Sequence, residues 1–146
     1  MSARPATLDS LQFATAGRNL SGEFTAAESD RLGDILDPSH GAVQYTLSGG
    51  LQGGRPVLRL HIEATVRLEC QRCLEPFSMP LTIEPVLLVA RDEVELSRWE
   101  AEDGLLDAIQ ADSRLDVQKL VEDEILLGLP LVPRHPDGGC EATLRA

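Results

Sequence analysis

The strongest constraint on the fold is a stretch of alternating apolar and polar residues between positions 58 and 69. Its apolar members are Leu58, Leu60, Ile62, Ala64, Val66 and Leu68. Arginine, histidine, glutamate and threonine side chains occupy the positions between them. A period of two residues over this length predicts a long β-strand with one buried face and one face in water.

A second alternating stretch follows after a short connection. Its apolar residues are Met79, Leu81 and Ile83, and positions 86–90 are then apolar throughout, as in a strand buried on both faces. The connection contains Cys70 and Cys73 in a Cys-x-x-Cys unit. The simplest interpretation is an antiparallel hairpin with this unit at its turn.

The segment before residue 58 contains weaker signals. Alternation at Leu11 and Phe13 suggests a strand, and residues 43–47 suggest another. Thr25 and Glu28 have capping-box spacing, which predicts a helix that ends at Asp37-Pro38. We expect the glycines at positions 49–54 to form a flexible loop between two strands.

The segment after residue 90 is expected to contain a short helix or loop around Trp99 and a strand near residues 105–109. From Asp116 the apolar spacing becomes helical, with this aspartate as the cap and Gly128 and Pro130 as the terminators. Glu122, Asp123 and Glu124 should face largely outward from this helix. These elements predict one α+β domain over residues 1–146, with 1–7 as a flexible tail, two to three helices, and an antiparallel sheet or partly open barrel.

The net charge of −11 disfavours a protein that coats nucleic acid with its whole surface. The acidity is concentrated, since residues 84–124 contain thirteen acidic and four basic residues. Such a block is either a solvated surface or a docking face for a basic partner, such as a ribosomal protein.

Several classes of protein are disfavoured by what the sequence lacks. No apolar run approaches the length of a membrane helix, and the N-terminal residues lack the apolar core of a signal peptide, so we expect a cytoplasmic protein. The odd number of cysteines argues against a disulfide framework. His40 and His61 are isolated, and no catalytic motif accompanies them, so we expect no enzyme.

Three cysteines and one histidine form a further pattern. Cys70 and Cys73 have a spacing that lets two thiolates bind one tetrahedral metal ion, and His135 and Cys140 follow in a turn-rich C-terminal loop. If that loop folds back over the hairpin, these four residues would bind Zn²⁺. The alternative is that the cysteines are reduced and partly buried, with His135 in an ordinary loop hydrogen bond.

Redox chemistry at Cys70 and Cys73 is a third possibility. In a thioredoxin-like motif, the N-terminus of a helix lowers the pKa of the reactive thiol. Here the motif lies between two strand patterns, and Pro76 follows too soon for a normal helix. The sequence therefore favours zinc binding or a buried pair over redox chemistry.

One stretch of eighteen residues, which runs along the long strand into the hairpin turn, contains four arginines: Arg55, Arg59, Arg67 and Arg72. Arg59 and Arg67 share the polar face of the long strand, and Arg72 lies between the cysteines. Guanidinium groups suit phosphate, so Arg59, Arg67 and Arg72 are candidate RNA-binding residues. The alternative is that they form ion pairs with Glu63 and Glu69.

Two stretches resemble the motifs of a known family. The first runs from Leu68 to Phe77 and contains the Cys-x-x-Cys unit, and the second runs from Leu120 to His135 and is followed by Cys140. In order and spacing they resemble the YceD family, the large ribosomal RNA subunit accumulation proteins of bacteria and plastids. The overall length is also similar, although residues 1–50 add little specificity.

The resemblance implies a non-enzymatic factor linked to accumulation of the 23S ribosomal RNA and to large-subunit assembly. We hypothesise that it binds ribosomal RNA or a pre-ribosomal particle, with the arginines on phosphate and residues 84–124 facing solvent or a basic ribosomal protein. Two rival hypotheses are an acidic adaptor that binds only protein and a thiol oxidoreductase. Zn²⁺ is the candidate cofactor.

Overall fold

The computed structural model describes residues 7–37, 39, 41–104 and 107–130. Its strands are β1 (Thr7–Leu8), β2 (Asn19–Phe24), β3 (Val43–Gln52), β4 (Arg55–Glu69), β5 (Pro76–Ile83), β6 (Val86–Ala90), β7 (Ala108–Gln110) and β8 (Leu115–Asp116). Its helices are α1 (Ser10–Thr15), the 3₁₀ turn η1 (Ala26–Glu28), α2 (Glu93–Glu102) and α3 (Val117–Gly128). The predicted α+β class is confirmed.

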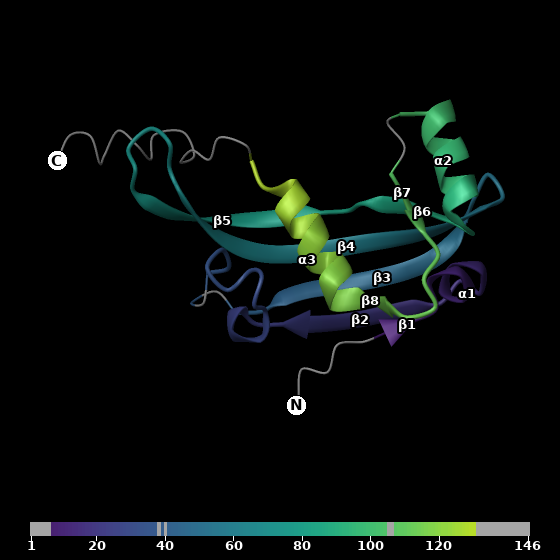
Figure 1. Ribbon diagram of the computed structural model, residues 1–146. Coiled ribbons are helices and arrows are strands. Elements are labelled where there is room, and N and C mark those ends of the chain that lie inside the picture. Colours follow the sequence, from purple (N-terminus) through teal and green to yellow (C-terminus); the bar gives the residue numbers. More distant parts are fainter. Residues whose placement is uncertain (1–6, 38, 40, 105–106, 131–146) are drawn as a thin grey trace.

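Strand β4 is the centre of the main sheet (Figure 1). It pairs antiparallel with β3 along one edge, from Gln44 opposite Glu63 to Gln52 opposite Arg55. Its even-numbered residues from Leu58 to Val66 are buried against the helices, as the alternation predicted. The glycines at 49 and 50 continue β3 instead of forming a loop, and only Gly53 and Gly54 make the turn, both with positive φ.

The other edge of β4 carries β5 and then β6. The predicted hairpin is confirmed, because Glu69 lies opposite Pro76 and Ile62 lies opposite Ile83. Beyond Pro85, whose carbonyl accepts a hydrogen bond from the Leu60 amide (3.0 Å), β6 resumes the same edge. Strand β7 pairs parallel to β6, so the sheet is mixed, and it does not close into a barrel.

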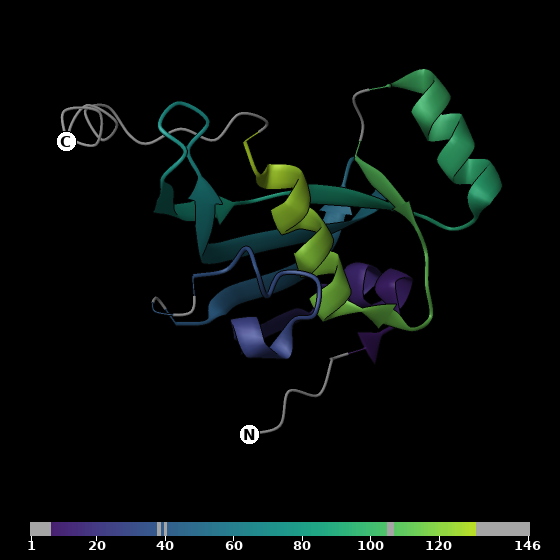
Figure 2. The ribbon, with the colours of Figure 1, turned by 60° about the vertical axis from the view of Figure 1, so that its left-hand side comes forward.

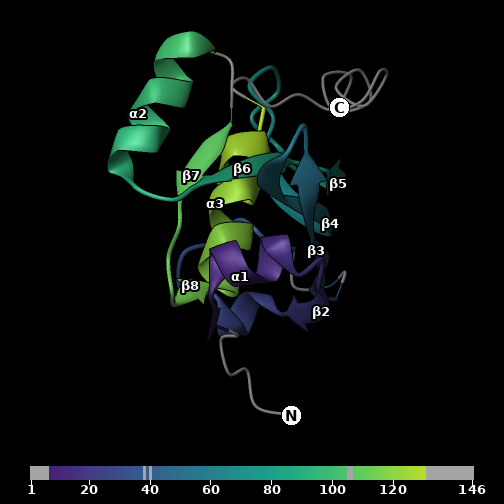
Figure 3. The ribbon, with the colours of Figure 1, turned by 90° about the vertical axis from the view of Figure 1, so that its right-hand side faces the viewer.

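The helices lie on one side of this sheet (Figure 3). Helix α3 packs across β4 and β5 and supplies Val117, Leu120, Val121 and Ile125 to the main core. It begins and ends as predicted, and the Asp116 carboxylate accepts a hydrogen bond from the Lys119 amide (3.1 Å). None of the helices in the described part of the chain is both long enough and apolar enough to span a bilayer.

The N-terminal segment is fixed by residues about a hundred positions later. Strand β1 pairs with β8, with Thr7 opposite Asp116. The Ser10 amide donates to the Asp112 carbonyl (3.0 Å), and the Ser10 hydroxyl accepts from the Asp112 amide (2.8 Å). Residues 1–6 of the expected tail lie outside the described residues.

Two predicted elements before residue 43 are wrong. The expected strand at Leu11 and Phe13 is helix α1, because Asp9 accepts a hydrogen bond from the Gln12 amide (3.1 Å) and starts a helix that buries Phe13. The expected helix after Thr25 is limited to η1. Ser29 adopts an extended conformation that ends the turn, and its hydroxyl accepts from the Leu32 amide (3.1 Å).

Helix α2 lies at the end of the sheet opposite the β4–β5 turn (Figure 1). Its only buried residue is Trp99, which packs with Val57, Leu88 and Ala90 in a small second core. Of the two predicted alternatives, a short helix or a loop around this tryptophan, the structure has the helix. Strand β7 confirms part of the strand predicted nearby, while residues 105 and 106 lie outside the described residues.

Candidate nucleic-acid interface and cysteine hairpin

The face of the main sheet opposite the helices is polar. On β4 it carries Arg59, His61, Glu63, Thr65 and Arg67, which are exposed or half-buried. No helix of the described residues covers this face (Figure 3). The alternating pattern of β4 has therefore placed two of the three candidate arginines on an open surface.

The arginines do not form one continuous patch. Arg67 is eight positions after Arg59 along the strand, which corresponds to about 26 Å. Arg59 donates from Nη2 to Oε1 of Gln52 (3.3 Å), while Arg72 is exposed at the hairpin turn. Within the described residues, no carboxylate lies at ion-pair distance from any of these three arginines, so the alternative, pairing with Glu63 and Glu69, is not formed.

An acidic centre separates the arginines on β4. His61 is not isolated, as the sequence suggested, because its Nε2 lies 3.1 Å from the Glu63 carboxylate and its Nδ1 lies 3.7 Å from that of Glu84. A shallow hollow beside it includes Glu23 and Gln44 of the neighbouring strands. The contact between His61 and Glu63 could have been predicted, because residues two apart on a strand share a face. The contact between His61 and Glu84 depends on the turn between β5 and β6, so the sequence pattern did not predict it.

The Cys-x-x-Cys unit forms the turn of the β4–β5 hairpin, as predicted. The Cys70 amide donates to the Glu75 carbonyl (3.0 Å), and the Leu74 amide donates to the Cys70 carbonyl (2.8 Å). Cys70 is fully buried and Cys73 is half-buried. The backbone reverses through Leu74, which has a φ of 63°.

The hairpin turn has an apolar floor. Cys70 and Phe77 form a small core with the partly buried Leu68, Cys73 and Met79. The next element is strand β5, so among the described residues no helix begins at the cysteines. The structure therefore lacks the helix N-terminus that activates a thioredoxin-like thiol.

The predicted zinc ligands are only partly within the described residues. Cys70 and Cys73 are there, whereas His135 and Cys140 lie outside the described residues. No group of three or more potential ligands forms among the residues that the structure describes. Two thiols alone do not complete the four-ligand shell that structural zinc requires.

Arg55, the first residue of β4, contacts α2 and is not one of the three phosphate-binding candidates. The Arg55 guanidinium lies over the Trp99 ring, 4.8 Å from its centroid, and 3.6 Å from the Glu102 carboxylate. Cation–π contact and ion pairing therefore hold α2 against the end of β4. The exposed acids around this helix are Asp92, Glu93, Glu100, Glu102 and Asp103.

Glu122 of α3 is a correction to the sequence analysis, which expected it to face outward. It is buried, and its carboxylate accepts hydrogen bonds from the Ser29 hydroxyl (2.6 Å) and from the side-chain Nε2 of Gln118 (3.3 Å). Arg31 lies 3.6 Å from Glu122 and 2.5 Å from Asp123. The loop after η1 is thereby fixed beside α3 (Figure 2).

Negative charge is also concentrated around Glu124 of α3. The pKa of Glu124 is raised, first by burial and then by the neighbouring carboxylates of Asp107 and Asp123. The acidic segment thus contains three environments: an exposed set on α2, a buried carboxylate with three partners, and a half-buried repulsive cluster.

Comparison with known proteins assigns the chain to a family. Residues 58–145, from β4 to beyond α3, match the family model described as large ribosomal RNA subunit accumulation protein YceD. A protein of that name from Haemophilus influenzae is 29% identical over 149 aligned positions, which cover 95% of this chain and 80% of that protein. No solved structure is significantly similar. The hairpin and α3 described above are therefore features of a chain that belongs to the YceD family.

Proposed function

We propose that this chain supports accumulation of 23S ribosomal RNA and assembly of the large ribosomal subunit in the cytoplasm, as a non-enzymatic factor that binds ribosomal RNA or a pre-ribosomal particle. The observation that carries this proposal is the family match, which spans both the cysteine hairpin and α3. The name of the H. influenzae relative points to the same process.

The distribution of charge supports contact with RNA despite the net charge of −11. The exposed acids of α2 and the β4–β5 turn lie at opposite ends of the sheet (Figure 1). At this end of the described structure, Arg67 and Arg72 face the carboxylates of Glu69, Glu75 and the buried Asp37, which is hydrogen-bonded to Ser78, so the net negative charge there is small. Phosphate is therefore least repelled at the hairpin end.

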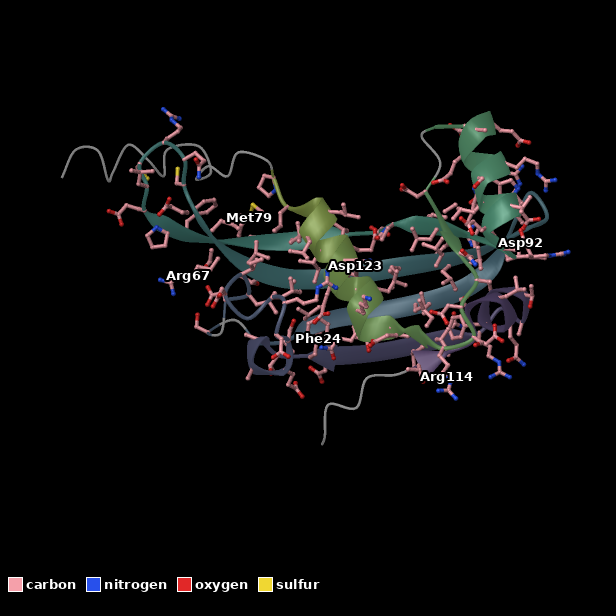
Figure 4. The ribbon with its side chains drawn as sticks, viewed as in Figure 1. Phe24, Arg67, Met79, Asp92, Arg114 and Asp123 are labelled. Atoms are coloured by element: carbon pink, nitrogen blue, oxygen red, sulfur yellow. The ribbon has the colours of Figure 1, made fainter. Side chains whose placement is uncertain are left out.

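Two arginines are the proposed phosphate contacts at that end. Arg67 extends from the end of β4 (Figure 4), and Arg72 lies on the turn. Neither has a carboxylate partner in the described part of the chain, so binding phosphate breaks no existing ion pair. Arg59 belongs to the far half of the strand and contributes a separate contact about 26 Å away.

The test combines an RNA readout with a matched arginine control. In cells that lack the natural protein, the chain carrying R67A and R72A should restore the ratio of 23S to 16S ribosomal RNA less well than the unchanged chain. In vitro, the same variant should bind 23S RNA fragments with a salt slope reduced by about 1.4–1.8, because two phosphate contacts are removed. The control variant carries R98A and R114A, which remove two exposed arginines from the acidic segment.

Crosslinking in cells distinguishes the main alternative. Recovery of 23S RNA with the unchanged chain, reduced by the R67A and R72A changes but not by the control, supports the proposal. Recovery of a basic protein without RNA would instead identify an acidic adaptor, with the exposed carboxylates of α2 as its docking face. Full restoration of the ribosomal RNA ratio by the R67A and R72A variant would exclude these arginines as the contacts.

A further inference from the structure

The outer edges of the main sheet are not equally protected. An edge strand presents peptide N–H and C=O groups without partners, and proteins usually block such an edge with proline, with charge or by keeping the strand short. Among the described residues the main sheet has three outer edges, along β2, β5 and β7. Strand β7 has only three residues, so it offers little length for pairing.

The outer edge of β5 is blocked by proline. The Leu60 amide donates to the carbonyl of Pro85, just beyond β5, so the even-numbered residues of β4 direct their peptide groups towards this edge. In the observed register their partners on β5 are odd-numbered, so the even-numbered residues of β5 direct their peptide groups outward. Pro76 and Pro80 are at two of these outward positions, and neither has an N–H to donate.

The outer edge of β2 has no such protection (Figure 1). The Gly49 amide donates to the Arg18 carbonyl (2.8 Å), and β2 continues the same register along β3. The even-numbered residues of β2 therefore direct their peptide groups towards β3, and those of Asn19, Ser21 and Glu23 point outward. All three residues are exposed, none is proline, and in the described part of the chain no strand pairs with them on that side.

From this geometry we propose that β2 pairs antiparallel with β2 of a second copy of this chain. A twofold axis at Ser21 places Asn19 opposite Glu23 of the second copy, and symmetry forms the reverse pair at the same time. The outward residues of both copies then face one another as hydrogen-bonded pairs, with about six backbone hydrogen bonds between them. The two main sheets become one continuous sheet.

The side chains at this edge favour a second copy over an unrelated strand. In the proposed register the Asn19 side chain, which carries N–H donors, lies beside the Glu23 carboxylate, which accepts, so no like charges are opposed. Glu23 is the only charged residue of β2, so the edge does not select a strongly basic strand. The same pattern read in the opposite direction is its own complement.

The distribution of charge also permits this pairing. The acidic helix α2 contacts β6 and β7, which are at the other end of the strand order from β2. In the dimer the two β6 strands are seven strand spacings apart, or about 34 Å along the sheet. This separation is several times the screening length of about 8 Å at physiological ionic strength, so the net charge of −11 opposes pairing only weakly at β2.

Sedimentation equilibrium of the full-length chain tests the dimer. The measured mass should rise with concentration from 15.8 kDa towards twice that value. One short strand per copy gives an interface in the small, weak class, so we expect a dissociation constant of about 1–100 µM.

The S21P variant tests which edge is used. It removes the central outward N–H but no hydrogen bond between β2 and β3, so it should stay monomeric. The matched control is T82P, which removes an outward N–H from the β5 edge and should dimerise like the unchanged chain. A mass fixed at 15.8 kDa up to about 1 mM, or a dimer that S21P leaves intact, would overturn the proposal.

A charge exchange tests the register without relying on proline. N19E opposes two carboxylates at both ends of the paired strands, so it should weaken dimerisation at least about tenfold. Adding E23K places opposite charges face to face, and the N19E/E23K chain should dimerise as tightly as the unchanged chain. Circular dichroism should show the same fold in all variants. Unchanged association of N19E, or failure of E23K to restore it, would contradict the pairing of Asn19 with Glu23.

Discussion

The Ser29 hydroxyl donates a hydrogen bond of 2.6 Å to the buried carboxylate of Glu122, which is 93 positions later in the chain. The same hydroxyl accepts from the Leu32 amide, so one side chain both starts the turn after η1 and binds α3. The side-chain Nε2 of Gln118 also donates to this carboxylate, and the Arg31 guanidinium lies beside it. The three recorded partners of this buried carboxylate all carry N–H or O–H groups directed at it, which offsets the cost of burying a polar group.

Replacing Glu122 with alanine should destabilise the protein by about 1–3 kcal/mol, because the Ser29 hydroxyl is left buried without its acceptor. Urea unfolding followed by circular dichroism measures this change. The control is E100A on the exposed side of α2, which should alter the free energy of unfolding by less than about 0.5 kcal/mol. Equal effects of the two changes would show that the hydrogen bonds of Glu122 contribute nothing to stability.

Replacing Glu124 with glutamine should stabilise the protein at neutral pH. Burial and the carboxylates of Asp107 and Asp123 raise the pKa of Glu124 above its usual 4.5. The folded state therefore binds more protons than the unfolded state between 4.5 and the raised pKa, and the free energy of unfolding falls as the pH rises through this window.

The E124Q variant lacks this ionisation, so its advantage over the unchanged chain should grow with pH through that window and then become constant. Urea unfolding at a series of pH values measures the difference. E100Q serves as the control for an exposed glutamate. An advantage of E124Q that is already complete at the acidic end would contradict the role of ionisation.

Gly49 should not tolerate a side chain. A Cβ at this position would overlap the carbonyl oxygen of Phe13 and the Cα of Ala14, both of which are backbone atoms of α1. We expect G49A to cost about 1–3 kcal/mol of stability through overpacking. A Cβ at Gly104 would have no neighbouring atom within 4 Å, so G104A is the matched control and should be close to neutral. A neutral G49A would mean that α1 can shift away from β3 without cost.

The single tyrosine of the chain provides a spectroscopic probe of the core. The pKa of Tyr45 is raised above its usual 10.0, first by burial and then by the charge of Asp116. Titration followed by phenolate absorbance should give a midpoint above 10.0 for the folded protein. The D116N variant, whose asparagine still caps α3, should have a lower midpoint that remains above 10.0 because burial persists. A midpoint unchanged by D116N would leave burial as the sole cause.

The sequence predicted the elements whose side chains alternate or repeat strongly. The predictions were correct for strand β4, for its hairpin with β5 and for α3, because each of these elements buries one regular face over many residues. Short elements were missed where a single polar side chain decides the local structure. Asp9 starts α1, and Ser29 ends the turn of η1.

The sequence predicted which residues belong to the candidate site better than it predicted how they are arranged in space. The positions of Arg59 and Arg67 on the open face follow from the alternation along β4. The acidic centre between them depends on Glu84, which reaches His61 only because the chain turns between β5 and β6. The burial of Glu122 depends on Ser29 and Arg31, which no local pattern connects to α3.

The pairing of β1 with β8 has a consequence for synthesis of the chain on the ribosome. Strands β2 to β5 each pair with the next strand in sequence, and β6 pairs with β4, two strands earlier, so these strands are able to assemble as they emerge. Thr7, in contrast, has its partner at Asp116. Strand β1 therefore waits until nearly all of the described chain has left the exit tunnel, and among the strand pairings of the described residues this late closure has the largest loss of loop entropy.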